Sequence, residues 1–334
     1  MKVLLTNNIF CQEEQWKAIY HASSTATPFQ SWDWIRISCQ ENRKILFANG
    51  FIGDDLVGIW PLEIRGGIAR YSAHSVSDYQ HPLLTENAKD LAPQFLQELT
   101  KTLGKTITVD LGELPQSLGF EGQIHSVCPR LKLSHSFEEI VANINSKTMR
   151  RDVRKGLRTS ELRQVTVSAE KFAKHFFALH DARWKQQDLP SGLKAGIRKF
   201  HENYLAQSPP EFKGELLTYE EKAIGAIYLL HKGSTTYFYQ SGWDPEYQSL
   251  SPGTLMVAFA IRNAISRGDT LFDFCRGNEY YKTRWLNSKL PGVTETGVNV
   301  RVAKGILSPI VNTSRSLEKA YRRFTGQLPK SIPT

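Results

Sequence analysis

The sequence predicts an α/β (α+β) chain of two lobes, and three observations support this prediction. The 334 residues exceed the usual size of a single compact domain. Two passages, which begin at Leu56 and Ala223, share a glycine and strand pattern, and each leads to an aspartate and then Tyr-Gln. The segment Thr235–Cys275 has the pattern strand, turn, apolar helix, strand. We therefore expect an N-terminal lobe at residues 1–135 and a C-terminal lobe at residues 136–334.

The elements of the first lobe begin with a short aromatic-rich helix over Phe29–Gln40. A hairpin follows, because the Gly53-Asp54-Asp55 turn separates two strand-like runs. The second lobe contains a similar hairpin, although short strand patterns also recur by chance and leave an unduplicated chain as the alternative. The four expected strands are Ile45–Phe51 with Leu56–Ile64, and Glu215–Tyr219 with Ala223–His231.

The segment Phe137–Arg163, between the lobes, has helical character. Gly156 inside it favours a kink or an early end. Basic residues at spacings of four, three and four lie on one face of such a helix and form a basic ridge. The ridge residues are Lys147, Arg151, Arg154 and Arg158, and the expected buried stripe is Ile140, Ile144, Val153 and Leu157.

The second lobe continues with a helix over Phe172–Gln187 and an aromatic, β-branched strand over Thr235–Gln240. An almost wholly apolar helix then runs from Leu255 to Arg267, where Gly268 ends it. A second strand is expected over Thr270–Cys275. A crossover of this kind is nearly always right-handed and leaves its loop at the carboxyl end of the sheet, where ligands bind.

Composition excludes several classes of protein. Hydrophobic residues make up 40% of the chain, which favours an ordered globular protein over a disordered one. The longest apolar stretch, Leu255–Ile261, is too short to span a bilayer, and the N-terminus lacks the pattern of a secretory signal, so we expect a cytoplasmic protein without a transmembrane segment. The cysteines show neither zinc-site nor disulfide spacing, and we expect no metal. They are Cys11, Cys39, Cys128 and Cys275.

The net charge of +9 is concentrated in two patches. Residues 147–163 hold seven basic and two acidic residues, and residues 301–334 hold seven basic and one acidic residue. An anionic substrate or partner is therefore plausible, and a solvated helix face is the alternative.

The start of the apolar helix is a candidate anion site. The first backbone amides of a helix lack intrahelical partners and lie at the positive end of its dipole, so a phosphate could bind there. Gly253 would allow close approach of the backbone. An ordinary helix start with Ser251 or Thr254 as cap is the alternative. The candidate donor-binding residues are Ser251, Pro252, Gly253 and Thr254.

Asp273 and Lys282 are the leading catalytic candidates. Asp273 is flanked by two phenylalanines, where a carboxylate needs a partner or a shifted pKa. Lys282 stands among three aromatic residues, and its ammonium could stabilise a developing oxyanion in a partly dry pocket. An Asp273–Lys282 salt bridge with a purely structural role is the competing interpretation.

Two further residues could accept a proton from a substrate. Asp244 lies at a strand end, a suitable place for a general base, although Asp before Pro also builds turns. His180 and Arg183 lie three residues apart on a helix and could face a cleft, although a lone helical histidine is more often structural.

These segments resemble the acetyltransferase family associated with bacterial cellulose and polysaccharide biosynthesis, a Fem-like branch of the GNAT superfamily. The resemblance covers most of the chain, and it rests on the order and spacing of its motifs. They are Phe29-Gln30-Ser31-Trp32-Asp33-Trp34, Ser77-Asp78-Tyr79, Arg150 to Arg158, Leu179 to Trp184, Gly242 to Tyr247, Ser251-Pro252-Gly253, Phe272-Asp273-Phe274 and Tyr281 to Trp285.

The resemblance implies two tandem GNAT-like lobes, each a mixed twisted sheet flanked by helices, with the acyl donor in the second lobe. In Fem-type peptidyltransferases a lysine at the place of Lys282 is thought to stabilise the tetrahedral intermediate. In GNAT enzymes the loop corresponding to Ser251–Thr254 binds the pyrophosphate of coenzyme A. This loop lacks the fuller Gly-rich signature of ordinary GNAT enzymes.

The sequence thus predicts an acyltransferase with acyl-CoA as co-substrate, no permanently bound cofactor and a small-molecule, sugar or peptide acceptor. Aminoacyl transfer from tRNA is the first alternative, without a role for DNA, and an inactive glycan- or peptide-binding module is the second. Catalysis is assigned to Lys282, Asp244, Asp273 and His180. Substrate binding is assigned to Arg151, Arg154, Arg158, Arg183, Tyr239 and Asp78.

Overall fold

The computed structural model describes residues 1–7, 13–39, 45–134, 136–186, 192–287, 289–290 and 292–302. The expected basic patch at 301–334 therefore lies almost wholly outside the described residues, and so does Cys11. The chain divides into two compact units. Unit 1 comprises 1–25, 39–126 and 296–334, and unit 2 comprises 26–38 and 127–295. The predicted division at residues 135/136 stays a prediction.

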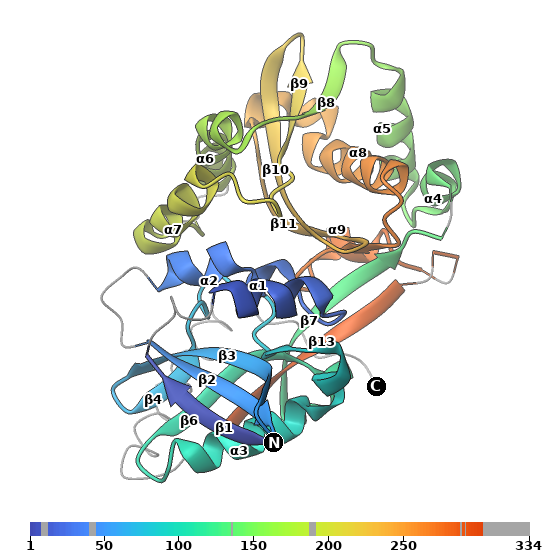
Figure 1. The fold of residues 1–334 in the computed structure, drawn as a ribbon. Helices are drawn as coiled ribbons and strands as arrows, with labels where there is room; N and C mark the ends of the chain where they lie inside the picture. Colours follow the sequence, from blue (N-terminus) through green and yellow to red (C-terminus); the bar gives the residue numbers. More distant parts are fainter. Residues whose placement is uncertain are drawn as a thin grey trace. The chain divides into compact units, whose positions relative to one another are not determined.

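Unit 1 is a mixed sheet with the strand order β1-β2-β3-β4-β6-β13, in which β5 pairs with β3 (Figure 1). Most neighbours are antiparallel, whereas β4 and β6 are parallel and joined through α3. Its elements are β1 (Lys2–Thr6), α1 (Glu13–Ala22), β2 (Ile45–Ile52), β3 (Asp55–Arg65), β4 (Ile68–Tyr71), β5 (Leu83–Leu84), η3 (Glu86–Leu91), α3 (Ala92–Thr102), β6 (Thr108–Pro115), η4 (Gln116–Leu118) and most of β13 (Gly292–Val302).

Unit 2 repeats this order. Its sheet runs β7-β12-β11-β10-β9-β8, antiparallel except for β11 and β12, which are parallel and joined through α8. Its elements are η2 (Pro28–Gln30), α2 (Trp32–Ser38), most of β7 (Gln123–Lys132), α4 (Phe137–Asn143), α5 (Lys147–Arg158), β8 (Leu162–Thr166), α6 (Ala169–Gln186), α7 (Ala195–Ala206), β9 (Glu215–Tyr219), β10 (Lys222–Lys232), β11 (Thr235–Trp243), η5 (Pro245–Leu250), α8 (Pro252–Ser266), β12 (Leu271–Asp273) and α9 (Tyr280–Thr283).

The mixed α/β fold predicted from the sequence is confirmed, and so are the two hairpins, β2 with β3 and β9 with β10, and the parallel crossover through α8. Two element boundaries differ. The segment expected as one helix over Phe137–Arg163 is α4, α5 and the start of β8. Ser146 caps α5, since its hydroxyl accepts a hydrogen bond from the Met149 amide. The expected strand over Thr270–Cys275 shortens to β12.

The helices of unit 2 cover both faces of its sheet (Figure 1). The helices α4, α5 and α8 form one apolar core with the strands, in which Met256 and Phe238 are buried. On the other face α6 lies close against β11, because Gly242 has no side chain and a Cβ there would collide with the backbone of His180. This close approach places the second half of α6 beside the carboxyl end of β11.

The packing of α5 on α8 corrects one detail of the expected buried stripe. Ile140, Ile144 and Val153 are buried as expected, but Leu157 is 38% exposed. Gly156 takes its place, because a Cβ at Gly156 would collide with the side chain of Leu255. The glycine that predicted a kink therefore serves close helix packing, and α5 continues to Arg158.

Candidate functional site

One edge of β11 lacks a strand partner at the carboxyl end of the unit 2 sheet. The pairing of β11 with β12 ends at Tyr237 and Asp273, whereas β11 itself continues to Trp243 alongside β10. Within the described residues, the β12 side of residues 238–243 is therefore unpaired, and we call it the unpaired β11 edge. Backbone amides along such an edge can donate hydrogen bonds to a substrate carbonyl oxygen.

Tyr239 is the extra residue of a β-bulge at the beginning of this edge, since its two neighbours pair with consecutive residues of β10. Its hydroxyl lies 3.3 Å from Nε2 of His201 on α7. Burial lowers the pKa of His201 to about 3, so its imidazole is neutral at pH 7. Sequence reasoning missed His201, because no local pattern marks a histidine whose partner is 38 residues away.

Arg183 and Tyr281 lie next to the unpaired β11 edge. Nη1 of Arg183 lies 3.3 Å from both the carbonyl and the hydroxyl oxygen of Ser241. The ring of Tyr281 packs edge-on against Phe238 at 6.3 Å. Burial raises the pKa of Tyr281 to about 12, and the nearby positive charges of Lys282 and Arg183 act in the opposite direction. The phenol is therefore protonated at neutral pH.

Lys282 is buried and all three of its hydrogen-bond donors have acceptors. Nζ lies 2.8 Å from the Arg276 carbonyl, 2.8 Å from the Glu279 carboxylate and 3.5 Å from the Cys275 carbonyl. Burial acts to lower the pKa of Lys282, but the neighbouring Tyr281 and Glu279 outweigh it and hold that pKa above its usual value. The ammonium thus clamps the loop after β12, and its predicted catalytic role stays a prediction.

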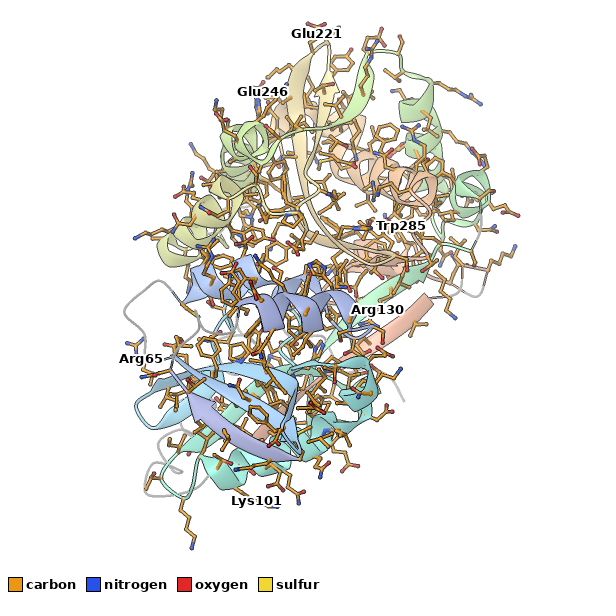
Figure 2. The ribbon with its side chains drawn as sticks, in the orientation of Figure 1. Arg65, Lys101, Arg130, Glu221, Glu246 and Trp285 are labelled. Atoms are coloured by element: carbon orange, nitrogen blue, oxygen red, sulfur yellow. The ribbon has the colours of Figure 1, made fainter. Side chains whose placement is uncertain are left out.

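Asp273 is fully buried at the end of β12 and is neutralised by Arg130 of β7 rather than by Lys282. Nε of Arg130 donates to Oδ2 at 2.8 Å, and the Cys275 amide donates to Oδ1 at 2.7 Å. Arg130, labelled in Figure 2, also pairs with Glu295 at 3.3 Å. The alternative of an Asp273–Lys282 salt bridge is therefore wrong, because a different cation holds this carboxylate.

Asp244 follows β11 directly and caps the short helix η5. Oδ1 accepts the Glu246 amide at 3.1 Å, and Oδ2 lies 3.2 Å from Nζ of Lys222. Its side chain is 20% exposed. Asp244 thus builds the turn that the Asp-Pro pair suggested, and it remains open to solvent beside the carboxyl end of β11.

His180 lies on α6, 1% exposed. Its Nε2 accepts a hydrogen bond from the Trp184 indole at 3.0 Å, so the neutral ring carries its proton on Nδ1. Nδ1 faces Asp181 at 3.8 Å. Burial lowers the pKa of His180 to about 4, although Asp181 acts to raise it. A substrate outside the core cannot reach this ring without local rearrangement.

The start of α8 offers few uncommitted amides. Pro252 has no N–H, and the amides of Thr254 and Leu255 both donate to the Ser251 carbonyl. Within the described residues Gly253 is thus the one amide of this first turn without an acceptor. The Ser251 hydroxyl donates to Asp152 of α5 at 2.9 Å. The helix dipole is present, but a full amide cradle for a phosphate is not.

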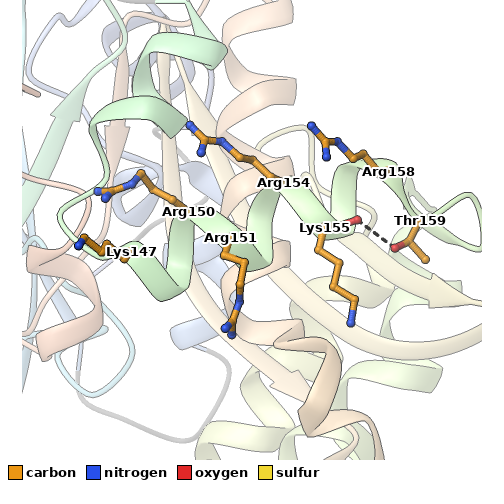
Figure 3. Close-up of a pocket in the computed structure, with 7 residues that line it drawn as sticks. All are labelled: Lys147, Arg150, Arg151, Arg154, Lys155, Arg158 and Thr159. Carbon is orange, nitrogen blue, oxygen red and sulfur yellow. Dashed lines mark hydrogen bonds between the residues drawn. The ribbon is translucent and has the colours of Figure 1, made fainter.

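The basic ridge lies along the exposed side of α5 and borders an open hollow of about 690 Å³ (Figure 3). The structure adds Arg150 and Lys155 to the ridge predicted from spacing. Arg150 donates to the Ile144 carbonyl, and Arg151 pairs with Asp152 at 3.0 Å. The residues that line the hollow are Lys147, Arg150, Arg151, Arg154, Lys155, Arg158 and Thr159.

The remaining predicted site residue, Asp78, belongs to unit 1 and is buried there. The other predicted site residues belong to unit 2. Among the described residues, no three side chains of His, Cys, Asp or Glu are grouped so that they could hold a metal ion. In the same part of the chain, no helix has both the length and the apolar character that a bilayer span requires.

Comparisons with known proteins agree with this architecture. Residues 145–283 match the family model described as "Acetyltransferase (GNAT) domain". This range contains α5, β11, α8 and α9, which are among the elements that build the candidate site. No curated protein matches the sequence at a significant level.

Three solved structures share the fold at low sequence identity. FemX is 10% identical with a TM-score of 0.65, over 91% of this chain and 98% of that chain. The C-terminal domain of a putative lysylphosphatidylglycerol synthetase from Agrobacterium fabrum is 11% identical with a TM-score of 0.60, over 94% and 96%. A tandem GNAT protein from the clavulanic acid biosynthesis pathway is 9% identical with a TM-score of 0.50, over 91% and 100%. The chain thus shares its fold with a tandem GNAT protein, and residues 145–283 are similar to a GNAT acetyltransferase domain.

Proposed function

We propose that unit 2 transfers an acyl group, in the simplest case acetyl, from acyl-CoA to an amine or hydroxyl acceptor. The observation that carries this proposal is the unpaired β11 edge. It begins where β11 and β12 separate, and β11 continues through η5 into α8. The match of residues 145–283 to an acetyltransferase domain supports it. In this reading the thioester carbonyl binds along the edge and the donor phosphates lie towards the start of α8.

The reaction needs one bond to form and one to break. The acceptor nitrogen or oxygen attacks the thioester carbonyl carbon, and amides of the unpaired β11 edge stabilise the oxyanion that results. The C–S bond then breaks. Tyr281, a phenol that stays protonated at neutral pH, can give its proton to the leaving thiolate. Lys282 supports this step by holding the Cys275–Glu279 loop and by supplying a buried positive charge.

The proton of the acceptor needs a base that solvent and substrate can reach. Asp244 is 20% exposed, whereas His180 is 1% exposed. We therefore assign this step to Asp244, which would release Lys222 when it accepts the proton. His180 and Asp273 are then positioning residues. His180 lies one turn before Arg183 on α6, and Asp273 pairs with Arg130.

The acceptor class and the biological setting rest on the sequence resemblance alone. That resemblance favours a sugar-type acceptor and a part in polysaccharide biosynthesis.

The test is release of free thiol from acetyl-CoA by the purified full-length chain, in the presence of amino sugars, sugars and peptide amines. We expect Tyr281→Phe to lower kcat by a factor of roughly 10² with little change in the acetyl-CoA KM. Tyr280→Phe is the matched control, since its ring is 71% exposed and one residue away. Absence of thiol release with every acceptor would count against acyl-CoA as the donor.

Aminoacyl transfer from charged RNA is the second candidate. The six cations of the basic ridge and the single uncommitted amide at the start of α8 favour a donor held by side-chain charge. The same purified chain is incubated with radiolabelled aminoacyl-tRNA and the same acceptors, and transfer of label identifies this activity. If neither donor reacts while a glycan or peptide still binds, an inactive binding module is the better interpretation.

A further inference from the structure

The hollow that the basic ridge borders is lined by positive charge, which favours an anionic ligand. Six of the seven residues that border its volume of about 690 Å³ are Lys or Arg, and none is acidic. Four of these six side chains are exposed to solvent, and within the described part of the chain they form no ion pair. They are Lys147, Arg154, Lys155 and Arg158.

This arrangement opposes the stability of α5 itself. Like charges at i,i+4 repel on a helix surface, and the ridge contains Arg150 with Arg154, Arg151 with Lys155, and Arg154 with Arg158. No acidic residue occupies the first turn of α5, so Lys147 also meets the positive end of the helix dipole. A bound anion would remove this repulsion, because it would place negative charge between the cations.

The ridge is physically joined to the start of α8. Asp152, within the ridge sequence, accepts the Ser251 hydroxyl at 2.9 Å and pairs with Arg151 at 3.0 Å. One turn later, Gly156 brings α5 into direct contact with Leu255 in the first turn of α8. On a helix Arg151 and Lys155 flank the face that carries these contacts, so this part of the ridge lies beside the helix start that the proposed function assigns to the donor phosphates.

The start of α8 offers few free backbone amides to donate hydrogen bonds to a phosphate. Within the described residues, Gly253 provides the one amide of its first turn that lacks an acceptor. Charged side chains next to it would compensate for the missing amides. We propose that the basic ridge binds the phosphate groups of the nucleotide part of the acyl donor. From the sequence we had assigned these cations to the acceptor instead.

The inference rests on the proposed function, and it narrows the donor to a molecule with several phosphates. Between Lys147 and Arg158 the helix rises by roughly 16 Å, at about 1.5 Å per residue. That length matches several phosphates and exceeds one. Coenzyme A and the acceptor end of a charged RNA share this chemistry, and the experiment separates them by direct binding.

The experiment measures the binding of four probes to the full-length chain by calorimetry: coenzyme A, 3′-dephospho-coenzyme A, pantetheine and a short RNA hairpin with a single-stranded 3′ end. The test variant is Arg154→Ala/Arg158→Ala. The control is Lys171→Ala/Lys199→Ala, which removes two exposed cations from α6 and α7. Both variants lower the net charge by two, so the difference between them reports position and not total charge.

We expect the ridge variant, but not the control, to bind coenzyme A or the RNA hairpin at least 10-fold more weakly. Pantetheine has no phosphate and should bind both variants equally. For the hairpin, the slope of log Kd against log salt should fall by about 1 to 2, as expected for two lost phosphate contacts. Ridge-dependent binding of coenzyme A alone identifies that donor, and ridge-dependent binding of the hairpin alone identifies RNA.

Equal binding of all probes by the ridge variant and the control overturns the inference. A ridge variant that raises KM for the acceptor and leaves KM for the donor unchanged also overturns it, while acyl transfer by that variant would leave the proposed function standing. Conversely, ridge-dependent phosphate binding without acyl transfer to any acceptor would defeat the proposed function and keep the ridge as a phosphate site.

Discussion

At the scale of single residues, the contacts of Lys282 lead us to expect a structural role for its ammonium. Its ammonium satisfies the Arg276 carbonyl and the Glu279 carboxylate, so Lys282→Met would leave a loop carbonyl without its donor. We expect a loss of about 1 to 3 kcal/mol in the free energy of unfolding, together with lower activity. Urea unfolding and steady-state kinetics measure the two effects on the same preparation.

Lys282→Arg is the comparison for this prediction, since it keeps the positive charge and changes the shape of the donor group. A direct oxyanion contact makes a different forecast. Lys282→Met would then lower kcat without any change in the urea midpoint, and that result would restore the role expected from the sequence.

Arg130 carries the second prediction at this scale. Its guanidinium neutralises Asp273, which is 0% exposed, and Glu295, which is 4% exposed. Arg130→Met leaves two buried carboxylates without their cation, and the expected cost is about 3 to 5 kcal/mol of unfolding free energy. Lys174→Met is the control, because its pair with Glu170 is exposed and contributes about 0 to 1 kcal/mol. Similar midpoints for the two variants in urea would contradict the structure.

At the scale of the elements, a substitution of Gly253 should affect donor binding without affecting folding. A Cβ at Gly253 would come no closer than 3.6 Å to any neighbour, so Gly253→Ala fits the first turn of α8 without strain. We expect unchanged or slightly higher stability, by up to about 1 kcal/mol, because alanine favours a helix. A donor phosphate against the Gly253 amide would collide with the new methyl group, so the donor KM should rise at least 10-fold.

The comparison variant is Gly196→Ala in the first turn of α7, where a Cβ meets no neighbour within 4 Å. It should leave both the melting temperature and the donor KM close to those of the parent. An unchanged donor KM for Gly253→Ala would place the phosphates elsewhere.

The elements were predictable where the signal is local. Strand-like runs on either side of a short polar turn predicted both hairpins, and the apolar run from Leu255 predicted α8. The break between α4 and α5 was missed, although Ser146 is a residue type that caps helices. The exposure of Leu157 could not be foreseen, because it follows from the contact of Gly156 with Leu255, 99 residues further on in the chain.

At the scale of the whole molecule, the repeated order of antiparallel strands, crossover helix and parallel strand explains the similar passages at Leu56 and Ala223. The site residues were predicted as types, but their partners were not. The pairing of Asp273 with Arg130 and of Tyr239 with His201 joins distant segments, and only the folded sheet brings them together. Residue spacing therefore could not predict which groups pair with the candidate site residues.

The free energy of unfolding should decrease as the pH is lowered, because two histidines are buried. In an unfolded chain a histidine has a pKa of about 6.5, whereas burial lowers the pKa of His180 to about 4 and that of His201 to about 3. Between these values the unfolded chain binds more protons than the folded one. Stability is therefore complete above about pH 6.5 and declines as the pH falls, with a slope of up to about 1.4 kcal/mol per pH unit for each histidine.

His201→Gln tests this dependence, since glutamine cannot take up the proton. The variant should lose about one half of the decline in unfolding free energy between pH 6.5 and 4.5, measured by urea titration at several pH values. His21→Gln is the control, because His21 is exposed on α1 and its loss should leave the slope unchanged. If His201→Gln retains the full slope of the parent, His201 is already protonated in the folded chain and its hydrogen bond with Tyr239 must run from the imidazolium to the phenol oxygen.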